Sequence, residues 1–234
     1  MISVASNKHQ ESYRAPSKCG SNGVLLRIPR TLADFRRWAL SDEVPEKLPL
    51  GFINGEVFVD MSKEEIRTHA LVKTAVGGAL FQLNEEINFG HLFIKGVLVT
   101  NVKAEVSNNP DLVAVSFRSL KVGRVRYIER DDRILEIEGS PDLVVEIVSD
   151  SSVIKDTRDL REAYHRAGIR EYWLIDARGE EILFQVLHWR KSAFTPSSVR
   201  DEWQKSRVFS CNFRLPRIRD RAGVWKYKLD SKKA

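Results

Sequence analysis

The 234-residue chain has little of what several classes of protein require. It holds only two cysteines, Cys19 and Cys211, too few for a disulfide framework or a cysteine-rich metal site. No apolar run approaches the roughly 20 residues that cross a bilayer, and the first 24 residues lack the apolar core of a secretory signal. We therefore expect a cytoplasmic protein without membrane contacts.

What the chain does contain is typical of one globular domain. Hydrophobic residues make up 42% and charged residues 30%, an ordinary balance for a soluble fold. The length suits one well-buried α/β domain, which we place at residues 24–225. Residues 1–23 are rich in polar residues and lack periodicity, so we expect a mobile tail there, and we expect a basic tail at 226–234.

Positive charge is clustered along the sequence. The net charge is +6, and residues 200–228 hold nine lysines or arginines against three acids. A second basic stretch occupies residues 118–130. Such clusters are suited to the phosphates of a DNA backbone, although a solvated basic face explains the charge equally well.

Residues 140–179 form the best-defined unit of the sequence. An apolar run at 143–148 predicts a buried strand, an amphipathic pattern at 153–167 predicts a helix that Gly168 ends, and 172–176 predicts a second strand. This order predicts parallel strands joined by a crossover helix. Glu146 interrupts the first strand, where a buried charge costs several kcal/mol unless a cation or a wet cleft receives it.

The remaining elements are predicted from local signals. Thr31 is a candidate N-cap of a helix, and Asn54-Gly55 predicts a hairpin between two strands. Ser62 and Glu65 resemble a capping box that opens a long helix. We also expect a helix at 62–87, strands at 92–100, 112–117 and 182–186, a hairpin at 126–137, and a strand-poor region beyond residue 189.

Two acids are candidates for metal binding. Asp111 stands where a strand begins, after Pro110, and Glu146 lies inside a strand. Carboxylates on neighbouring strands suit Mg²⁺, for which Mn²⁺ can substitute, and such an ion can promote phosphodiester cleavage. Spacing alone is a weak signal, because two acids in an α/β protein are usually exposed or ion-paired. His69, on the inward face of the long helix, is either a core histidine or a proton carrier.

Three segments carry a resemblance to a known family. They are Pro110-Asp111, the stretch 141–149 that reads PDLVVEIVS, and the stretch 164–176 that reads YHRAGIREYWLID. Within residues 50–186 the sequence resembles the Uma-two family of restriction endonucleases, from the PD-(D/E)xK nuclease-like superfamily. The resemblance implies a restriction-endonuclease-like core, with a central mixed β-sheet flanked by helices and an N-terminal hairpin and helix. It also implies Mg²⁺ on Asp111 and Glu146, and DNA as substrate.

The sequence departs from the family pattern at the lysine. The superfamily places lysine where this chain has Val148, and the relatives' displaced lysine position holds Leu160. We assign the lysine role to Lys155, with Arg158 and Arg161 as rival cations and an ordinary solvated lysine as the alternative. Relatives often carry glutamate where this chain has Gly51, which leaves Glu56 and His69 as auxiliary groups.

The sequence therefore predicts a Mg²⁺-dependent DNA endonuclease. The predicted catalytic set is Asp111, Glu146, Lys155, His69 and Glu56, with Asp111 and Glu146 as metal ligands. The alternatives are a catalytically inactive nucleic-acid-binding module and a protein-interaction module on the same fold. A homodimer would allow two sites to cut two strands.

Overall fold

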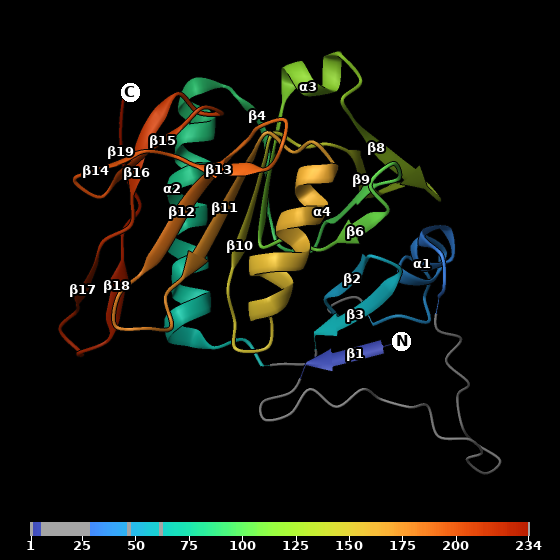
Figure 1. The fold of residues 1–234 in the computed structure, drawn as a ribbon, viewed down its shortest axis with the longest axis horizontal. Helices are drawn as coiled ribbons and strands as arrows, with labels where there is room; N and C mark the ends of the chain where they lie inside the picture. Colours follow the sequence, from blue (N-terminus) through green and yellow to red (C-terminus); the bar gives the residue numbers. More distant parts are fainter. Residues whose placement is uncertain (1, 6–28, 46–47, 61–62, 234) are drawn as a thin grey trace, which may run out of the picture.

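The computed structural model describes residues 2–5, 29–45, 48–60 and 63–233 (Figure 1). It has the mixed α/β architecture that the sequence predicts. The helices are α1 (Leu32–Ala39), α2 (Leu71–Ile87), α3 (Phe117–Lys121) and α4 (Leu160–Arg166). Two π-helical turns, η1 (Ile66–Ala70) and η2 (Lys155–Asp159), lead directly into α2 and α4. None of the described helices is both long enough and apolar enough to cross a membrane.

A six-stranded mixed sheet forms the centre of the molecule, in the order β13-β12-β11-β10-β7-β4. Its strands are β4 (Gly90–Ile94), β7 (Leu112–Ser116), β10 (Leu143–Ile147), β11 (Glu171–Asp176), β12 (Leu183–Trp189) and β13 (Phe194–Pro196). β10 and β11 pair in parallel, and β12 returns antiparallel beside β11. Both pairings were predicted from the sequence and are confirmed.

A seven-stranded sheet lies against one side of this centre, in the order β1-β3-β2-β6-β5-β9-β8. Its strands are β1 (Ile2–Ala5), β2 (Leu50–Ile53), β3 (Glu56–Asp60), β5 (Leu98–Asn101), β6 (Val106–Asn108), β8 (Val125–Arg130) and β9 (Arg133–Gly139). The predicted Asn54-Gly55 hairpin is confirmed, because these two residues turn the chain with φ of 53° and 83° between β2 and β3.

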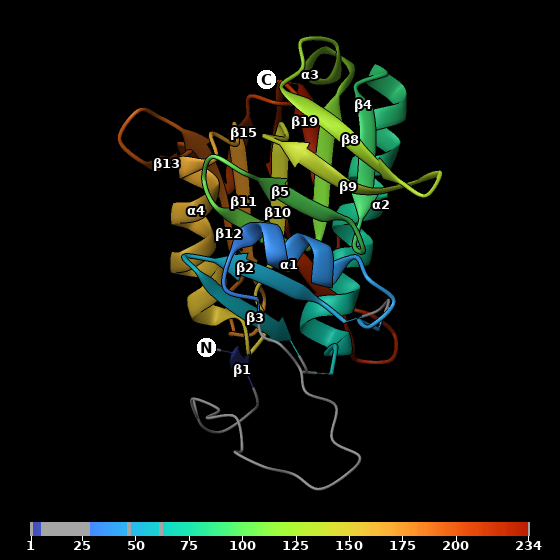
Figure 2. The same ribbon diagram turned by 90° about the vertical axis from the view of Figure 1, so that its right-hand side faces the viewer.

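The two faces of the central sheet are covered differently, as Figures 1 and 2 show. Helix α2 packs on one face through Val72, Val76 and Leu80, in a core cluster that includes Trp173. Helix α4 covers the other face, where Tyr164 and its neighbours meet residues from the seven-stranded sheet. The site described below therefore lies where both helices approach the ends of β7 and β10.

The C-terminal region differs from the prediction. It contains β14 (Val199–Arg200), β15 (Trp203–Ser206), β16 (Cys211–Arg214), β17 (Arg217–Arg219), β18 (Trp225–Tyr227) and β19 (Asp230–Lys233). The expectation of a strand-poor region is wrong, because Phe213, Tyr227 and Leu229 bury themselves in the main core cluster and order the short strands around them. Most of the segment assigned to a basic tail is β18 and β19, and β19 pairs with β16.

Two other predictions are corrected or only partly covered. The single strand expected at 92–100 is two strands in different sheets, because Lys95 and Gly96 turn the chain with φ of 61° and 86°. At the N-terminus, residues 2–5 form β1, which pairs with β3, and the rest of the tail predicted at 1–23 lies outside the described residues. Ser62 of the proposed capping box also lies outside them, and Glu65 is the N-cap of η1.

Candidate active site

Strand pairing brings the two candidate metal ligands together. β7 and β10 are antiparallel, with Val145 opposite Leu112. One further step of this register places Glu146 opposite Asp111, and residues directly opposite each other in such a pair project from the same face. The backbone N–H of Ile147 donates a hydrogen bond of 2.9 Å to Asp111 Oδ2, which fixes the Asp111 carboxylate beside the end of β10.

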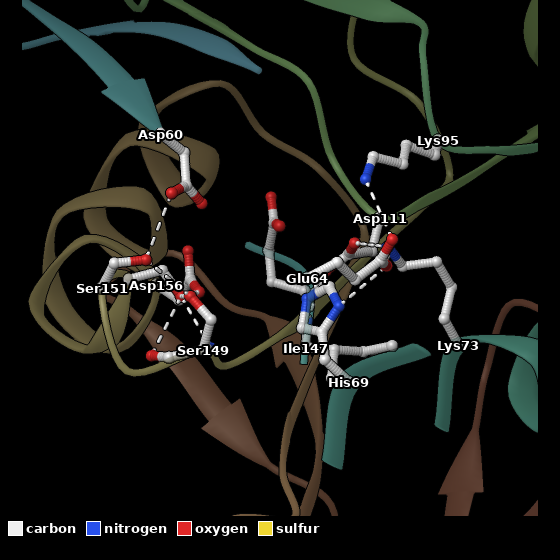
Figure 3. Close-up of polar contacts among 12 residues, drawn as sticks. Asp60, Glu64, His69, Lys73, Lys95, Asp111, Ile147, Ser149, Ser151 and Asp156 are labelled. Carbon is white, nitrogen blue, oxygen red and sulfur yellow. Dashed lines mark hydrogen bonds and ion pairs between the residues drawn. The ribbon is translucent and has the colours of Figure 1, made fainter. Parts of the chain in front are cut away.

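A cleft of about 480 Å³ opens at this end of the sheet. The polar and charged residues of its lining come from five segments of the chain, and several are drawn in Figure 3. They are Asp60, His69, Lys95, Asn109, Asp111, Glu146, Ser149, Ser152, Lys155 and Asp156. Four of the five residues predicted as catalytic, namely His69, Asp111, Glu146 and Lys155, thus lie around one cavity.

Asp111 is held by two cations from the start of the α2 segment. Lys73 Nζ lies 2.9 Å from Asp111 Oδ1, and His69 Nε2 lies 3.4 Å from Asp111 Oδ2. Glu64 lies on the far side of both, 2.5 Å from Lys73 Nζ and 3.1 Å from His69 Nδ1 (Figure 3). Two acids therefore alternate with a lysine and a histidine beside the cleft, whose lining includes His69 and Asp111.

These contacts set the protonation of the cluster. Burial raises the pKa of Asp111, but His69 and Lys73 outweigh it and hold that pKa well below its usual range. The hydrogen bond from Lys73 is the main cause that lowers the pKa of Glu64 to about 2. Burial lowers the pKa of His69, yet the Asp111 carboxylate raises it by more. Near neutral pH we therefore expect Asp111 to be ionised, and the contact with Asp111 favours the protonated form of His69.

Glu146 has a different environment, because its hydrogen bonds come from neutral donors. Tyr164 Oη donates to Glu146 Oε1 at 2.7 Å, and Asn108 Nδ2 donates to the same oxygen at 2.9 Å. Burial raises the pKa of Glu146 well above its usual value, and the charges of Asp156 and Asp111 raise it further, while Lys155 lowers it. Glu146 is thus a buried acid that lacks a direct cationic partner among the described residues.

Lys155 and Asp156 complete the other edge of the cleft, at the start of η2. Lys155 Nζ lies 3.3 Å from Asp156 Oδ1, an oxygen that accepts no hydrogen bond from any described residue, and Ser152 Oγ donates to Asp156 Oδ2. Burial lowers the pKa of Lys155, but Asp156, Glu146 and Asp111 raise it by more. The lysine therefore stays charged and faces three carboxylates.

The hydroxyl of Tyr164 helps to orient the Glu146 carboxylate. Tyr164→Phe removes one of the two donors to Glu146 Oε1 and leaves the rest of the ring in place. Removing such an outer partner weakens metal sites by about 10- to 100-fold, so we expect Mg²⁺ affinity to fall by about tenfold. Isothermal titration with Mg²⁺ measures this, and Tyr127→Phe, outside the cleft, is the control. An unchanged Mg²⁺ affinity in Tyr164→Phe would contradict the assigned role of this hydroxyl.

Glu56 is the predicted site residue that the structure places elsewhere. It is exposed at the start of β3, beside the Asn54-Gly55 turn, and the described lining of the cleft does not include it. Sequence reasoning missed five residues that contact the predicted set: Glu64, Lys73, Asn108, Asp156 and Tyr164. One signal was available, because Lys73 follows His69 by four residues and so shares its helix face.

The donor set of the cleft fits a divalent cation. Asp156 Oδ1 is a buried oxygen without a hydrogen bond, and burial with neighbouring negative charge raises the pKa of both Glu146 and Asp156. In the part of the chain that the structure describes, no three His, Cys, Asp or Glu side chains are close enough to hold a metal jointly. The opposed carboxylates of Asp111 and Glu146 make a pair, the number that Mg²⁺ usually takes from protein while retaining waters.

Comparison with solved structures identifies the fold. The chain resembles a crystal structure from Anabaena variabilis ATCC 29413, described as a putative nuclease belonging to DUF820, with 18% identity and a TM-score of 0.57. The match covers 77% of this chain and 91% of that one. A central mixed sheet with acids at the ends of two paired strands is thus the restriction-endonuclease-like fold that the sequence predicts.

Comparison with family models then gives the family. The model of Uma2, described as "Putative restriction endonuclease", matches residues 32–217. This chain therefore belongs to the Uma2 family, which confirms the resemblance seen in the sequence. The search of curated proteins found no match.

Proposed function

We propose that this protein is a Mg²⁺-dependent endonuclease that hydrolyses phosphodiester bonds of DNA. The observation that carries the proposal is the convergence of Asp111, Glu146 and Lys155 on one cleft, with the two acids opposed across β7 and β10. Membership of the Uma2 family and the fold shared with the Anabaena nuclease support it. The net charge of +6 suits a polyanionic substrate.

Each residue of the cleft has a role that follows from its contacts. Asp111 and Glu146 would hold the cation, with Asn108 and Tyr164 orienting Glu146. When bound, Mg²⁺ supplies charge that polarises the phosphoryl group, lowers the pKa of water and stabilises the leaving oxygen. Lys155, charged and directed at the carboxylates, would stabilise negative charge that develops on the phosphate.

His69 is the candidate for proton transfer at the opposite edge of the cleft. Its two ring nitrogens lie beside Asp111 and Glu64, so the imidazole is fixed in orientation and its pKa is raised by Asp111. An imidazole held in this way can take a proton from water or return one to the leaving oxygen. Lys73 lies behind it and keeps Asp111 ionised.

The test of this function is a nicking assay on supercoiled plasmid with purified protein. We expect relaxed and linear DNA with Mg²⁺ or Mn²⁺ and intact plasmid with EDTA. The cleavage rate should depend on which cation is added. Ca²⁺ has a looser coordination geometry than Mg²⁺, so it should support DNA binding better than DNA cleavage. Plasmid that stays intact with every cation, at protein concentrations that bind it, would contradict the proposal.

Two observations favour a second candidate, a DNA-binding module without turnover. His69 and Lys73 both contact the Asp111 carboxylate, so a divalent ion must share that acid with two cations. In addition, Val148 is buried where the superfamily places its lysine. Binding of DNA that is unaffected by Mg²⁺ and never followed by cleavage would support this candidate. A homodimer remains a prediction, tested by the molar mass in solution.

A further inference from the structure

A second cavity, of about 500 Å³, lies at the other end of β10 from the cleft. Asp142 lines it just before β10 begins, whereas Glu146 lines the cleft near the end of the strand. Arginines from three distant segments surround it. Arg124 precedes β8, Arg170 precedes β11, and Arg207 follows β15. Folding therefore assembles a cationic cavity from pieces of the chain that are far apart in sequence.

The positive charge of this cavity is only partly neutralised. Asp142 is the one carboxylate of its described lining, and it already accepts bonds from Ser116 N, Ser119 Oγ and Arg170 Nη1, the last at 2.5 Å. One acid thus offsets one arginine. Arg124 and Arg207 form no ion pair with a described carboxylate, and the charge of Asp142 acts on Arg124 without direct contact, so the described lining keeps an excess of positive charge.

Arg124 carries a hydrogen-bond donor that the described residues leave unsatisfied. Its Nη2 donates to the backbone oxygen of Gly168, but its Nε is buried and has no partner among the described residues. Burial lowers the pKa of Arg124, and the nearby charge of Arg170 lowers it further. A buried guanidinium N–H without an acceptor costs free energy, which an anion would restore by accepting that hydrogen bond.

We propose that Arg124, Arg170 and Arg207 form a binding pocket for a phosphate group carried by a nucleotide or by a DNA strand. Guanidinium groups present planar forks of N–H donors that match the oxygens of a phosphate. Phe89 and Trp189 supply an apolar wall beside these charges, which suits a phosphate attached to an organic group. The pocket is separate from the cleft, so the proposal holds whether or not the protein cleaves DNA.

The test measures phosphate binding in variants that each remove one guanidinium. Arg207→Gln changes an exposed side chain, so it should fold normally, and Arg124→Gln removes the orphan donor. We expect each variant to bind 5′-dAMP about tenfold more weakly in isothermal titration, equal to about 1.4 kcal/mol. Arg200→Gln is the matched control, because this arginine is 94% exposed, lies outside the pocket and loses the same charge.

The remaining measurements separate the source of the phosphate from simple charge effects. All titrations contain EDTA, so that DNA stays intact, and they compare 5′-dAMP with deoxyadenosine. They then compare an oligonucleotide with and without a 5′-phosphate. If the protein prefers the 5′-phosphorylated strand, the pocket binds a terminal phosphate. If it binds both strands equally, and Arg207→Gln weakens that binding, the pocket binds a phosphodiester. The proposal would be overturned if Arg207→Gln and Arg200→Gln bound 5′-dAMP with equal affinity. It would also be overturned if the wild type bound neither 5′-dAMP nor the oligonucleotides.

Discussion

Replacing Glu146 by glutamine should reduce the proposed Mg²⁺-dependent DNA cleavage by at least about a thousandfold, because it removes a ligand from the proposed two-carboxylate site. Glutamine has almost the same size and keeps an oxygen that can accept from Asn108 and Tyr164. The loss should therefore come from the missing charge. The cleavage rate on supercoiled plasmid, measured at saturating Mg²⁺, tests this prediction.

The same substitution should stabilise the metal-free protein, and this second effect distinguishes a ligand from a structural acid. Burial raises the pKa of Glu146 above the usual 4.5, so the folded protein binds this proton more tightly than the unfolded chain does. Stability contributed by this group is therefore lost as pH rises from about 4.5 through the raised pKa. At pH 8 we therefore expect the free energy of unfolding of Glu146→Gln to exceed that of the wild type, and we expect the difference to disappear as the pH falls toward 4.5.

Two comparisons make this prediction specific. Glu162→Gln makes the same chemical change at an exposed position in α4, so cleavage and stability should stay as in the wild type. Adding Mg²⁺ should stabilise the wild type and leave Glu146→Gln almost unchanged. A glutamine variant that still cleaves DNA, or that is less stable than the wild type at pH 8 without metal, would show that Glu146 is a structural residue.

The central unit of the fold was predictable because its signals are local. The apolar run of β10, the amphipathic pattern of α4 and the apolar strand β11 each extend over enough residues to show their period. The short order of strand, helix and strand then fixes parallel pairing. The C-terminal strands could not be found in this way, since they have two to four residues and are ordered by burial of Phe213 and Tyr227 in a distant core.

Sequence alone could identify only those site residues whose type is unusual for the predicted element. Glu146 stood out because an acid in an apolar strand needs a reason. The position of Asp111 opposite Glu146 depends on the register of β7 and β10. The paired residues of these strands are about thirty positions apart in sequence. The spacing of Lys73 and His69 indicates that they share a helix face, but it does not show that Lys73 is a buried cation, because that burial depends on contact with Asp111 from another element.

The structure offers two lysines for one catalytic role, and a pair of variants separates them. Lys155 lies 3.3 Å from Asp156, on the Glu146 side of the cleft, whereas Lys73 lies 2.9 Å from Asp111 and also pairs with Glu64. Lys73 is thus neutralised by two acids that it touches directly. Lys155 lines the cleft and pairs with Asp156 alone among the described residues, and Asp156 Oδ1 accepts no hydrogen bond from them. Lys155 is therefore better placed to meet a substrate phosphate.

Lys155→Gln should therefore lower the cleavage rate by about a hundredfold or more, the effect of removing one donor that stabilises charge in the transition state. It should also cost about 3 kcal/mol of unfolding free energy at pH 8, because Asp156 and Glu146 lose their nearest cation. The cost should shrink near pH 5, since both acids have raised pKa values and can take up a proton there. Plasmid nicking and urea unfolding at the two pH values measure these effects.

Arg158→Gln is the matched control for Lys155→Gln, because Arg158 lies in the same π-helical turn, is exposed and forms its ion pair among the described residues with its neighbour Asp159, at 2.7 Å. It should change neither cleavage nor the pH dependence of stability. Lys73→Gln should destabilise the protein through Asp111 and Glu64, yet retain cleavage once Mg²⁺ occupies the site. If Lys73→Gln abolishes cleavage at saturating Mg²⁺ and Lys155→Gln does not, the lysine that acts on the substrate comes from α2 rather than from the turn that follows β10.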